Sequence, residues 1–159
     1  MPATELAKHL NIKIITPSEI PGIPDDLLEL LHKGRDLWSA AIFSRAEKKY
    51  IIHNPLHSPA RQESNLMHEL AHAICEHQLM ELETALTSCV IPLRKYDIVQ
   101  EAEAECLGAC LQLPQKALFH YYHILKKNNS EISNIFTASS EMVRYRLSIT
   151  GVLRIKYPK

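Results

Sequence analysis

The sequence predicts an α+β protein that is mainly α-helical, with a small β-sheet or hairpin packed on one central helix. Helix-like segments bounded by capping residues and prolines cover most of the chain, whereas strand-like apolar runs are few and short. The chain has 159 residues, of which 46% are hydrophobic, so it can build one core but not two comfortable domains. We therefore expect a single domain over residues 1–159.

The strand-like runs lie in the N-terminal third. Residues 11–16 are predicted to form a short strand or extended segment after a first helix, because several helix breakers follow directly: Pro17, Pro21, Gly22 and Pro24. A second helix is expected to begin after the last of these prolines. The apolar runs 38–43 and 50–53 are separated by a charged stretch, which predicts a β-hairpin with a solvated turn.

The central helix is expected to open at Ser58 or Pro59 and to run to about Gln78, since proline suits the first helical turn and no breaker follows inside. Residues 80–96 are predicted to be a loop-rich crossing, because Pro92 interrupts any long helix there.

Three more helices are expected towards the C-terminus. Asp97 can cap a helix that runs to Leu113 and is stopped by Pro114. The other two are predicted over residues 115–127 and 141–149.

Charge and hydropathy exclude several classes of protein. Eighteen basic and eighteen acidic side chains cancel, so no field of one sign favours direct nucleic-acid binding or an anionic membrane. No stretch approaches the roughly 20 apolar residues that a membrane span requires, and the N-terminal segment is polar. We expect a cytoplasmic protein whose four cysteines remain thiols.

The segment His68-Glu69-Leu70-Ala71-His72 is an H-E-x-x-H motif in the middle of the predicted central helix. Histidines four residues apart lie one turn apart on one helix face, so both imidazoles can reach one zinc ion. At 100° per residue the core-facing positions fall on the other side of the helix: Leu66, Met67, Leu70, Ala73 and Ile74. The alternative is a solvated, charged helix face with two incidental histidines, and the helical context favours the metal site.

A catalytic zinc needs three protein ligands and one open position for water. A third histidine six residues after His72 would indicate a metzincin, but that position is Gln78. Glu101 and Glu105 lie one turn apart on one face of the helix predicted from residue 97, whereas Glu103 points elsewhere. One carboxylate of this pair can bind the metal while the other accepts a hydrogen bond from a ligating histidine. The alternative is that both belong to the solvated face of an amphipathic helix, and the H-E-x-x-H motif favours the ligand.

Two segments resemble the ImmA/IrrE family of bacterial metallopeptidases. They are residues 54–77, NPLHSPARQESNLMHELAHAICEH, and residues 101–114, EAEAECLGACLQLP. The run from Ser139 to Leu147 is similar to the family's closing helix. The resemblance implies a zincin-like metallopeptidase domain and assigns the third zinc ligand to Glu101, which leaves Glu105 as the histidine's hydrogen-bond partner.

The resemblance also implies a substrate. Members of this family typically cleave a helix-turn-helix transcriptional repressor, so the expected partner is such a protein, with no direct contact to nucleic acid. We expect no fused helix-turn-helix module before the catalytic part. Ser64 and Asn65 replace an Arg or Phe-Thr stretch of many relatives, and Glu105 replaces a frequent Asn or Asp.

The predicted mechanism uses Glu69 as the general base for a zinc-activated water. Arg61 lies on the metal side of the helix and is a candidate for binding substrate, or a surface arginine at a helix start. Cys75 also lies on that side, and a buried structural thiol is the default. His77 falls opposite His68 and His72 by helical angle, which predicts an ordinary packed or surface histidine.

Two other functions fit the same motif. The first is a non-catalytic, zinc-containing binding module that sequesters a regulator, although Glu69 has no purpose in it. The second is a zinc hydrolase acting on a small amide or a cell-wall peptide.

Overall fold

The computed structural model describes residues 1–20, 22–34, 37–82 and 97–155. The N-terminal part contains α1 (Ala3–His9), β1 (Ile12–Ile15), the 3₁₀ turn η1 (Pro17–Glu19) and α2 (Asp25–Lys33). The middle contains β2 (Ala40–Arg45), β3 (Lys48–His53), α3 (Pro59–Ile74) and β4 (Met80–Glu81). The C-terminal part contains α5 (Ile98–Gln112), α6 (Gln115–Phe119), the π-helical turn η2 (His120–Ile124), α7 (Asn129–Phe136), α8 (Ser140–Ile149) and the 3₁₀ turn η3 (Val152–Arg154).

The four strands form one mixed sheet in the order β1-β3-β2-β4. β2 and β3 form the predicted hairpin, while β1 pairs with β3 and β4 pairs with β2 in parallel. The strands extend into the charged stretch that was predicted to be the turn, and only Ala46 and Glu47, with φ of 46° and 64°, connect them. Two left-handed residues match the right-handed twist of the strands in so short a loop.

α3 begins where the sequence predicts. The Ser58 hydroxyl accepts a hydrogen bond from the Arg61 amide, and proline occupies the first turn. Its predicted end near Gln78 is wrong, because the helix stops at Ile74. Glu76 has a φ of 56°, and the His77 amide donates back to the His72 carbonyl at 3.1 Å. A left-handed residue with a bond of this type ends a helix as a Schellman motif does.

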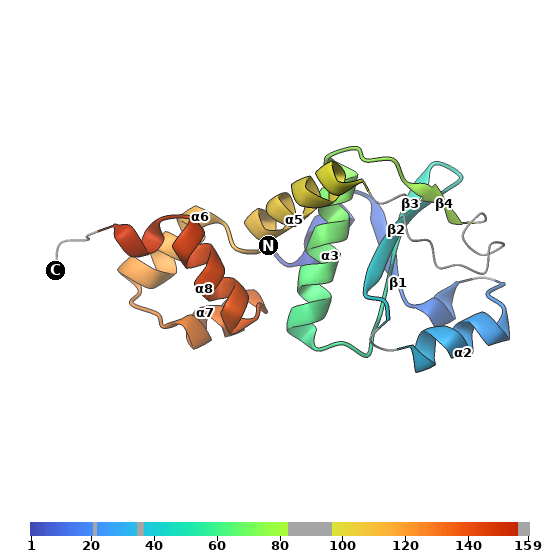
Figure 1. Cartoon of the computed structure of the whole chain (residues 1–159), viewed down its shortest axis with the longest axis horizontal. Helices are drawn as coiled ribbons and strands as arrows, with labels where there is room; N and C mark the ends of the chain where they lie inside the picture. The colour runs from blue at the N-terminus through green and yellow to red at the C-terminus, as the bar shows by residue number, and fades with distance from the viewer. Residues whose placement is uncertain (21, 35–36, 83–96, 156–159) are drawn as a thin grey trace.

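The sheet carries a hydrophobic cluster on each face, and α3 lies across one face, as Figure 1 shows. The first cluster joins α1, β1, the hairpin and α3 through apolar side chains that include Leu6, Ile42, Ile51, Met67 and Leu70. The second lies on the other face: Ile15, Ile20, Phe43, Ile52 and Leu82. The prediction of a mainly helical α+β fold, with a small sheet on the H-E-x-x-H helix, is confirmed.

α5 packs against α3 on the side away from the sheet (Figure 1). Its start is capped as predicted, since the Asp97 carboxylate accepts from the amides of Val99 and Gln100. Ala104 is fully buried, and Gly108, one turn later, lies against the α3 backbone. Small residues at these two positions let α5 approach α3 closely. This close packing determines where Glu101 lies along α3.

The helices after α5 gather around a third cluster, which includes Leu113, Leu118, Ile132, Val143 and Leu147. The predicted single helix over 115–127 is wrong, because α6 gives way to the π-helical η2 at His120. α7 was not predicted. The predicted helix 141–149 is confirmed as α8, one residue longer at its start.

Two contacts tie these C-terminal helices to the end of α5. The buried Arg146 guanidinium donates to the Leu113 carbonyl from Nη2 at 3.1 Å and from Nε at 3.3 Å. The Gln112 side chain donates to the Thr137 carbonyl at 3.2 Å. α5 therefore joins the two parts of the molecule: it packs against α3, and its end is hydrogen-bonded to the C-terminal helices.

Most of the predicted crossing 80–96, with Pro92 and Cys89, lies outside the described residues; its first two residues form β4. The other three cysteines are free thiols. None of the described helices has the length and apolar character needed to cross a lipid bilayer.

Candidate metal centre

Two histidines of α3 and one glutamate of α5 bring their donor atoms together. His68, His72 and Glu101 each offer a ligand atom, and these atoms all lie within 4.8 Å of one another. The distance between the two Nε2 atoms is 3.0 Å, and Glu101 Oε2 lies 3.2 Å from that of His68. Glu101 Oε1 lies 3.6 Å from Nε2 of His72. The three predicted ligands thus converge on one point from two helices.

Helical periodicity explains this arrangement. The face of α3 opposite the histidines is buried in the cluster against the sheet, where Met67 and Leu70 are at most 1% exposed. Ile74 is an exception, because it is the last residue of the shortened helix and is 40% exposed. Glu101 lies in the first turn of α5, seven residues before Gly108, so the close contact of the two helices carries its carboxylate to the histidines.

The geometry suits a metal ion. A tetrahedral ion with bonds of about 2.0–2.2 Å, such as zinc forms with imidazole and carboxylate, holds neighbouring ligand atoms about 3.3–3.5 Å apart. The two Nε2 atoms are 3.0 Å apart, and each has a Glu101 oxygen nearby, Oε2 at 3.2 Å from His68 and Oε1 at 3.6 Å from His72, so all three separations are close to this range. Two imidazole nitrogens and one carboxylate are also the donor set of catalytic sites that keep one position open. The side chains of His68 and Glu101 remain 30% and 25% exposed, which leaves the cluster accessible from one side.

Glu69 is buried between α3 and the sheet. Its side chain is 6% exposed, and its Oε2 accepts a hydrogen bond of 2.9 Å from the backbone amide of Ile42 in β2. β4 pairs with β2 only at Phe43 and Ser44, so among the described residues Ala40–Ile42 have no strand partner on this side. The carboxylate next to the two histidines is therefore anchored to the backbone of β2.

His77 is a packed histidine outside the donor group, as predicted, but its predicted direction is wrong. The helix stops before it, so the helical angle that placed it opposite His68 and His72 does not apply. Its Nδ1 lies 2.8 Å from Nδ1 of His72, and its Nε2 lies 3.1 Å from Oε2 of Glu103. Glu103 lies outside the donor group, as predicted, but its contact with His77 was not predicted. Sequence reasoning missed both residues because Glu76 gives no local sign of a left-handed helix stop, which glycine or asparagine usually marks.

The other sequence candidates lie apart from the donor atoms. Glu105 is exposed, and no hydrogen bond or ion pair joins it to either histidine. Cys75 is exposed rather than buried and is not part of the donor group. Arg61, two turns before His68, is exposed and donates to the Ser39 hydroxyl at 3.4 Å.

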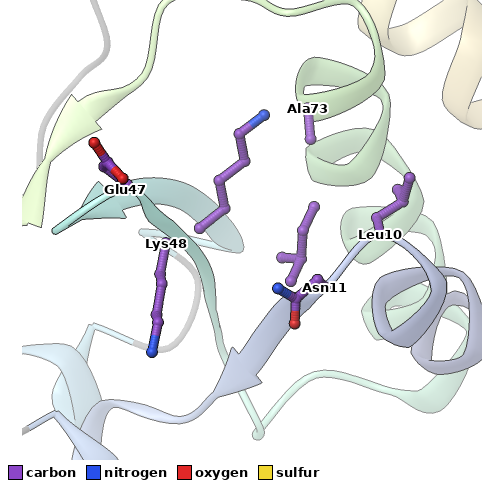
Figure 2. A pocket seen from close by; sticks show the side chains of 7 residues that line it. Leu10, Asn11, Glu47, Lys48 and Ala73 are labelled. Atoms are coloured by element: carbon purple, nitrogen blue, oxygen red, sulfur yellow. The ribbon is translucent and has the colours of Figure 1, made fainter.

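Two hollows flank α3. One of about 230 Å³ lies along the first half of α3, and it is lined by Ser58, Ala60, Arg61, Ser64, Asn65, Gln112, Ser139 and Met142. The other, of about 200 Å³, lies between the end of α1, the hairpin turn and Ala73 (Figure 2). Neither is lined by a metal-donor residue, and only the first lies on the helix face next to Arg61.

Comparison with known proteins identifies the family. The model of a peptidase family described as IrrE N-terminal-like domain matches residues 26–148, which include both histidines, Glu69 and Glu101. No curated protein and no solved structure matches the chain. The matched region spans well over half of the sequence and contains the whole candidate metal centre, so the chain belongs to the ImmA/IrrE family of metallopeptidases.

Proposed function

We propose that this chain is a zinc-dependent endopeptidase that cleaves a helix-turn-helix transcriptional repressor. The observation that carries the proposal is the convergence of His68, His72 and Glu101 beside the buried carboxylate of Glu69. Two histidines and one carboxylate from the protein, with one side left open, are typical of zinc sites that hydrolyse peptides.

In the proposed mechanism His68, His72 and Glu101 hold the zinc ion, which when bound lowers the pKa of a water molecule and polarises the scissile carbonyl. Glu69 takes the proton of the attacking water and passes it to the leaving amine. The bond from the Ile42 amide supports this role, because it holds the carboxylate in place beside the two histidines.

The surroundings of Glu69 also support a polypeptide substrate. No strand among the described residues pairs with Ala40–Ile42 on this side, and an extended segment could lie along β2 there, with backbone hydrogen bonds at Ala40 because the Ile42 amide is bound to Glu69. Arg61 and the hollow that it lines lie further along α3, and we propose that this guanidinium binds the substrate beyond the scissile bond.

A repressor is the proposed substrate because family membership implies protein substrates and because members of this family typically act on such proteins. The test uses purified helix-turn-helix repressors that are encoded beside the gene for this chain. Each is incubated with wild type, Glu69→Gln and Glu101→Ala, with products identified by mass spectrometry and zinc content measured on the same samples.

We expect one zinc per wild-type chain and cleavage at one site in one repressor. Glu69→Gln should keep the zinc, because its amide oxygen can still accept from Ile42, but should not cleave, since an amide is not a base. Glu101→Ala should lose most of the zinc. The exposed Glu141→Gln is the matched control and should behave as wild type. Wild type that binds zinc and a repressor without cutting it would replace the proposal with a sequestering module.

A further inference from the structure

We propose that His77 and Glu103 position His72 as a metal ligand through a chain of hydrogen bonds that, with both rings neutral, selects one tautomer in each ring. This inference rests on the proposed metal centre. It adds two positioning residues that do not themselves touch the metal.

The chain of contacts runs from the surface to the buried ligand. The Glu103 side chain is 58% exposed and lies 3.1 Å from Nε2 of His77. The His77 side chain is 5% exposed, and its Nδ1 lies 2.8 Å from Nδ1 of the fully buried His72. Three residues from two helix ends thus form one line that stops at the donor cluster.

The chemistry of each group sets the direction of these bonds. An ionised carboxylate only accepts, so Nε2 of His77 carries the proton that it donates to Glu103. Nδ1 of a neutral His77 is then an acceptor, and Nδ1 of His72 must be the donor. A neutral His72 protonated on Nδ1 has its lone pair on Nε2, the atom that faces His68 and Glu101. The relay therefore presents the ligand atom of His72 in the form that a metal ion needs.

Burial explains why a second histidine is useful here. His72 is 0% exposed, so water cannot serve as the partner of its Nδ1, and an unpaired buried N–H would be costly. Ligating histidines generally donate this second N–H to a carboxylate, a carbonyl or a water, and that bond fixes the ring and increases its basicity. Through its bond to Glu103, His77 becomes a stronger hydrogen-bond acceptor for His72, which Glu103 does not contact directly.

The backbone brings the relay together. His77 reaches His72 only because Glu76 turns the chain back after α3, and Glu103 reaches His77 because α5 lies along α3. The rings of His72 and His77 also pack edge to face at 4.9 Å. A purely structural role of His77 would rest on this packing, so the experiment has to separate hydrogen bonding from ring contact.

The test compares His77→Phe, which keeps a ring without hydrogen bonds, with His77→Gln, whose amide oxygen and N–H can replace the two ring nitrogens. Glu103→Ala removes the terminal acceptor, and the exposed His9→Phe is the control for losing a histidine. Zinc affinity is measured by competition with a chromophoric chelator. The cobalt(II) form is followed by visible absorption, and melting of the metal-free proteins checks the fold.

We expect zinc affinity to fall about 10- to 100-fold in His77→Phe and to be largely restored in His77→Gln, with a smaller loss in Glu103→Ala. His9→Phe should bind as wild type does. In metal-free wild type, ¹⁵N-edited NMR of the imidazoles should show the proton of His72 on Nδ1 and that of His77 on Nε2.

The outcomes separate the relay from the metal centre. Wild type that binds no zinc overturns the proposed function. Zinc binding by wild type together with undiminished affinity in His77→Phe, or with the His72 proton on Nε2 in the metal-free protein, overturns the relay alone.

Discussion

Gly108 lies directly against the backbone of His68: a β-carbon on residue 108 would be 3.1 Å from both the nitrogen and the α-carbon of His68. No other contact of a glycine in the described residues involves the metal centre. This glycine sets the distance between α3 and α5, and the distance determines where Glu101 lies relative to the two histidines.

Replacing Gly108 with valine should therefore weaken both stability and metal binding. The atoms that the new side chain meets belong to the α3 backbone and cannot rotate away. We expect the free energy of unfolding to fall by about 1–3 kcal/mol from overpacking, which exceeds the gain of about 0.5 kcal/mol in helix propensity. Roughly tenfold weaker zinc binding, about 1.4 kcal/mol, should accompany it.

Urea denaturation and chelator competition measure the two effects. Cys106→Val, at an exposed position of the same helix, is the control and should change neither quantity. Normal zinc affinity in Gly108→Val would show that the helix spacing does not control Glu101.

Removal of the N-terminal cap of α5 should weaken zinc binding, whereas removal of a cap elsewhere at a similar cost in unfolding free energy should not. Asp97→Ala loses the acceptor for Val99 and Gln100, at a cost of about 1 kcal/mol. Glu101 lies in the same turn, so fraying of this turn should weaken zinc binding about fivefold. Ser139→Ala removes the equivalent cap of α8 and should cost similar stability without changing zinc affinity. Equal zinc affinities in the two variants would contradict the prediction.

His53 should make stability depend on pH. Burial lowers its pKa below 6.5, the Glu19 charge opposes this only in part, and its Nδ1 is buried without a hydrogen bond. The unfolded chain therefore takes up a proton near pH 6.5 while the folded chain does not. The contribution of the neutral His53 to the free energy of unfolding is therefore complete above pH 6.5. It is lost as the pH falls through the lower pKa that His53 has in the folded chain.

Urea unfolding of metal-free wild type and His53→Gln across this range measures the effect. The difference in unfolding free energy between the two proteins should change with pH below 6.5 and stay constant above it. A difference that is constant throughout would show that His53 titrates alike in both states.

The two larger cores provide a test of the single-domain prediction. Leu70 is fully buried under the sheet, and Leu147 is 1% exposed in the C-terminal cluster. Each change to alanine should cost about 2–5 kcal/mol. Because Arg146 and Gln112 tie the C-terminal helices to α5, we expect both variants to unfold in one transition at a lower temperature. Two separate transitions in Leu147→Ala, seen by calorimetry, would divide the chain into two folding units.

Elements with strong local signals could be predicted from the sequence. Ser58 and Pro59 mark the start of α3, Asp97 marks that of α5, and the four-residue spacing of His68 and His72 places both on one face. These features depend on residues close together in the chain. Physical rules for capping and periodicity are sufficient to find them.

The missed features depend on contacts between distant residues or on unusual backbone. The parallel pairing of β1 with β3 joins Ile14 to Ile51, and no local pattern announces it. The π-helical turn at His120 breaks a segment whose residues suit an ordinary helix. The bond between His77 and Glu103 spans 26 positions and needs the left-handed Glu76, so a helical wheel placed His77 wrongly and could not bring the two residues together.

The left-handed Glu76 limits how this centre can be transplanted into another protein. A host helix that simply continued past the second histidine would carry the residue five positions on to the far side. If the proposed relay holds, a graft of His68–His72 alone would thus carry two candidate ligands but would leave His72 without its hydrogen bond to His77. The segment to transplant is the end of α3 together with the left-handed Glu76 and His77. A designer would place it at the end of a host helix rather than in its middle.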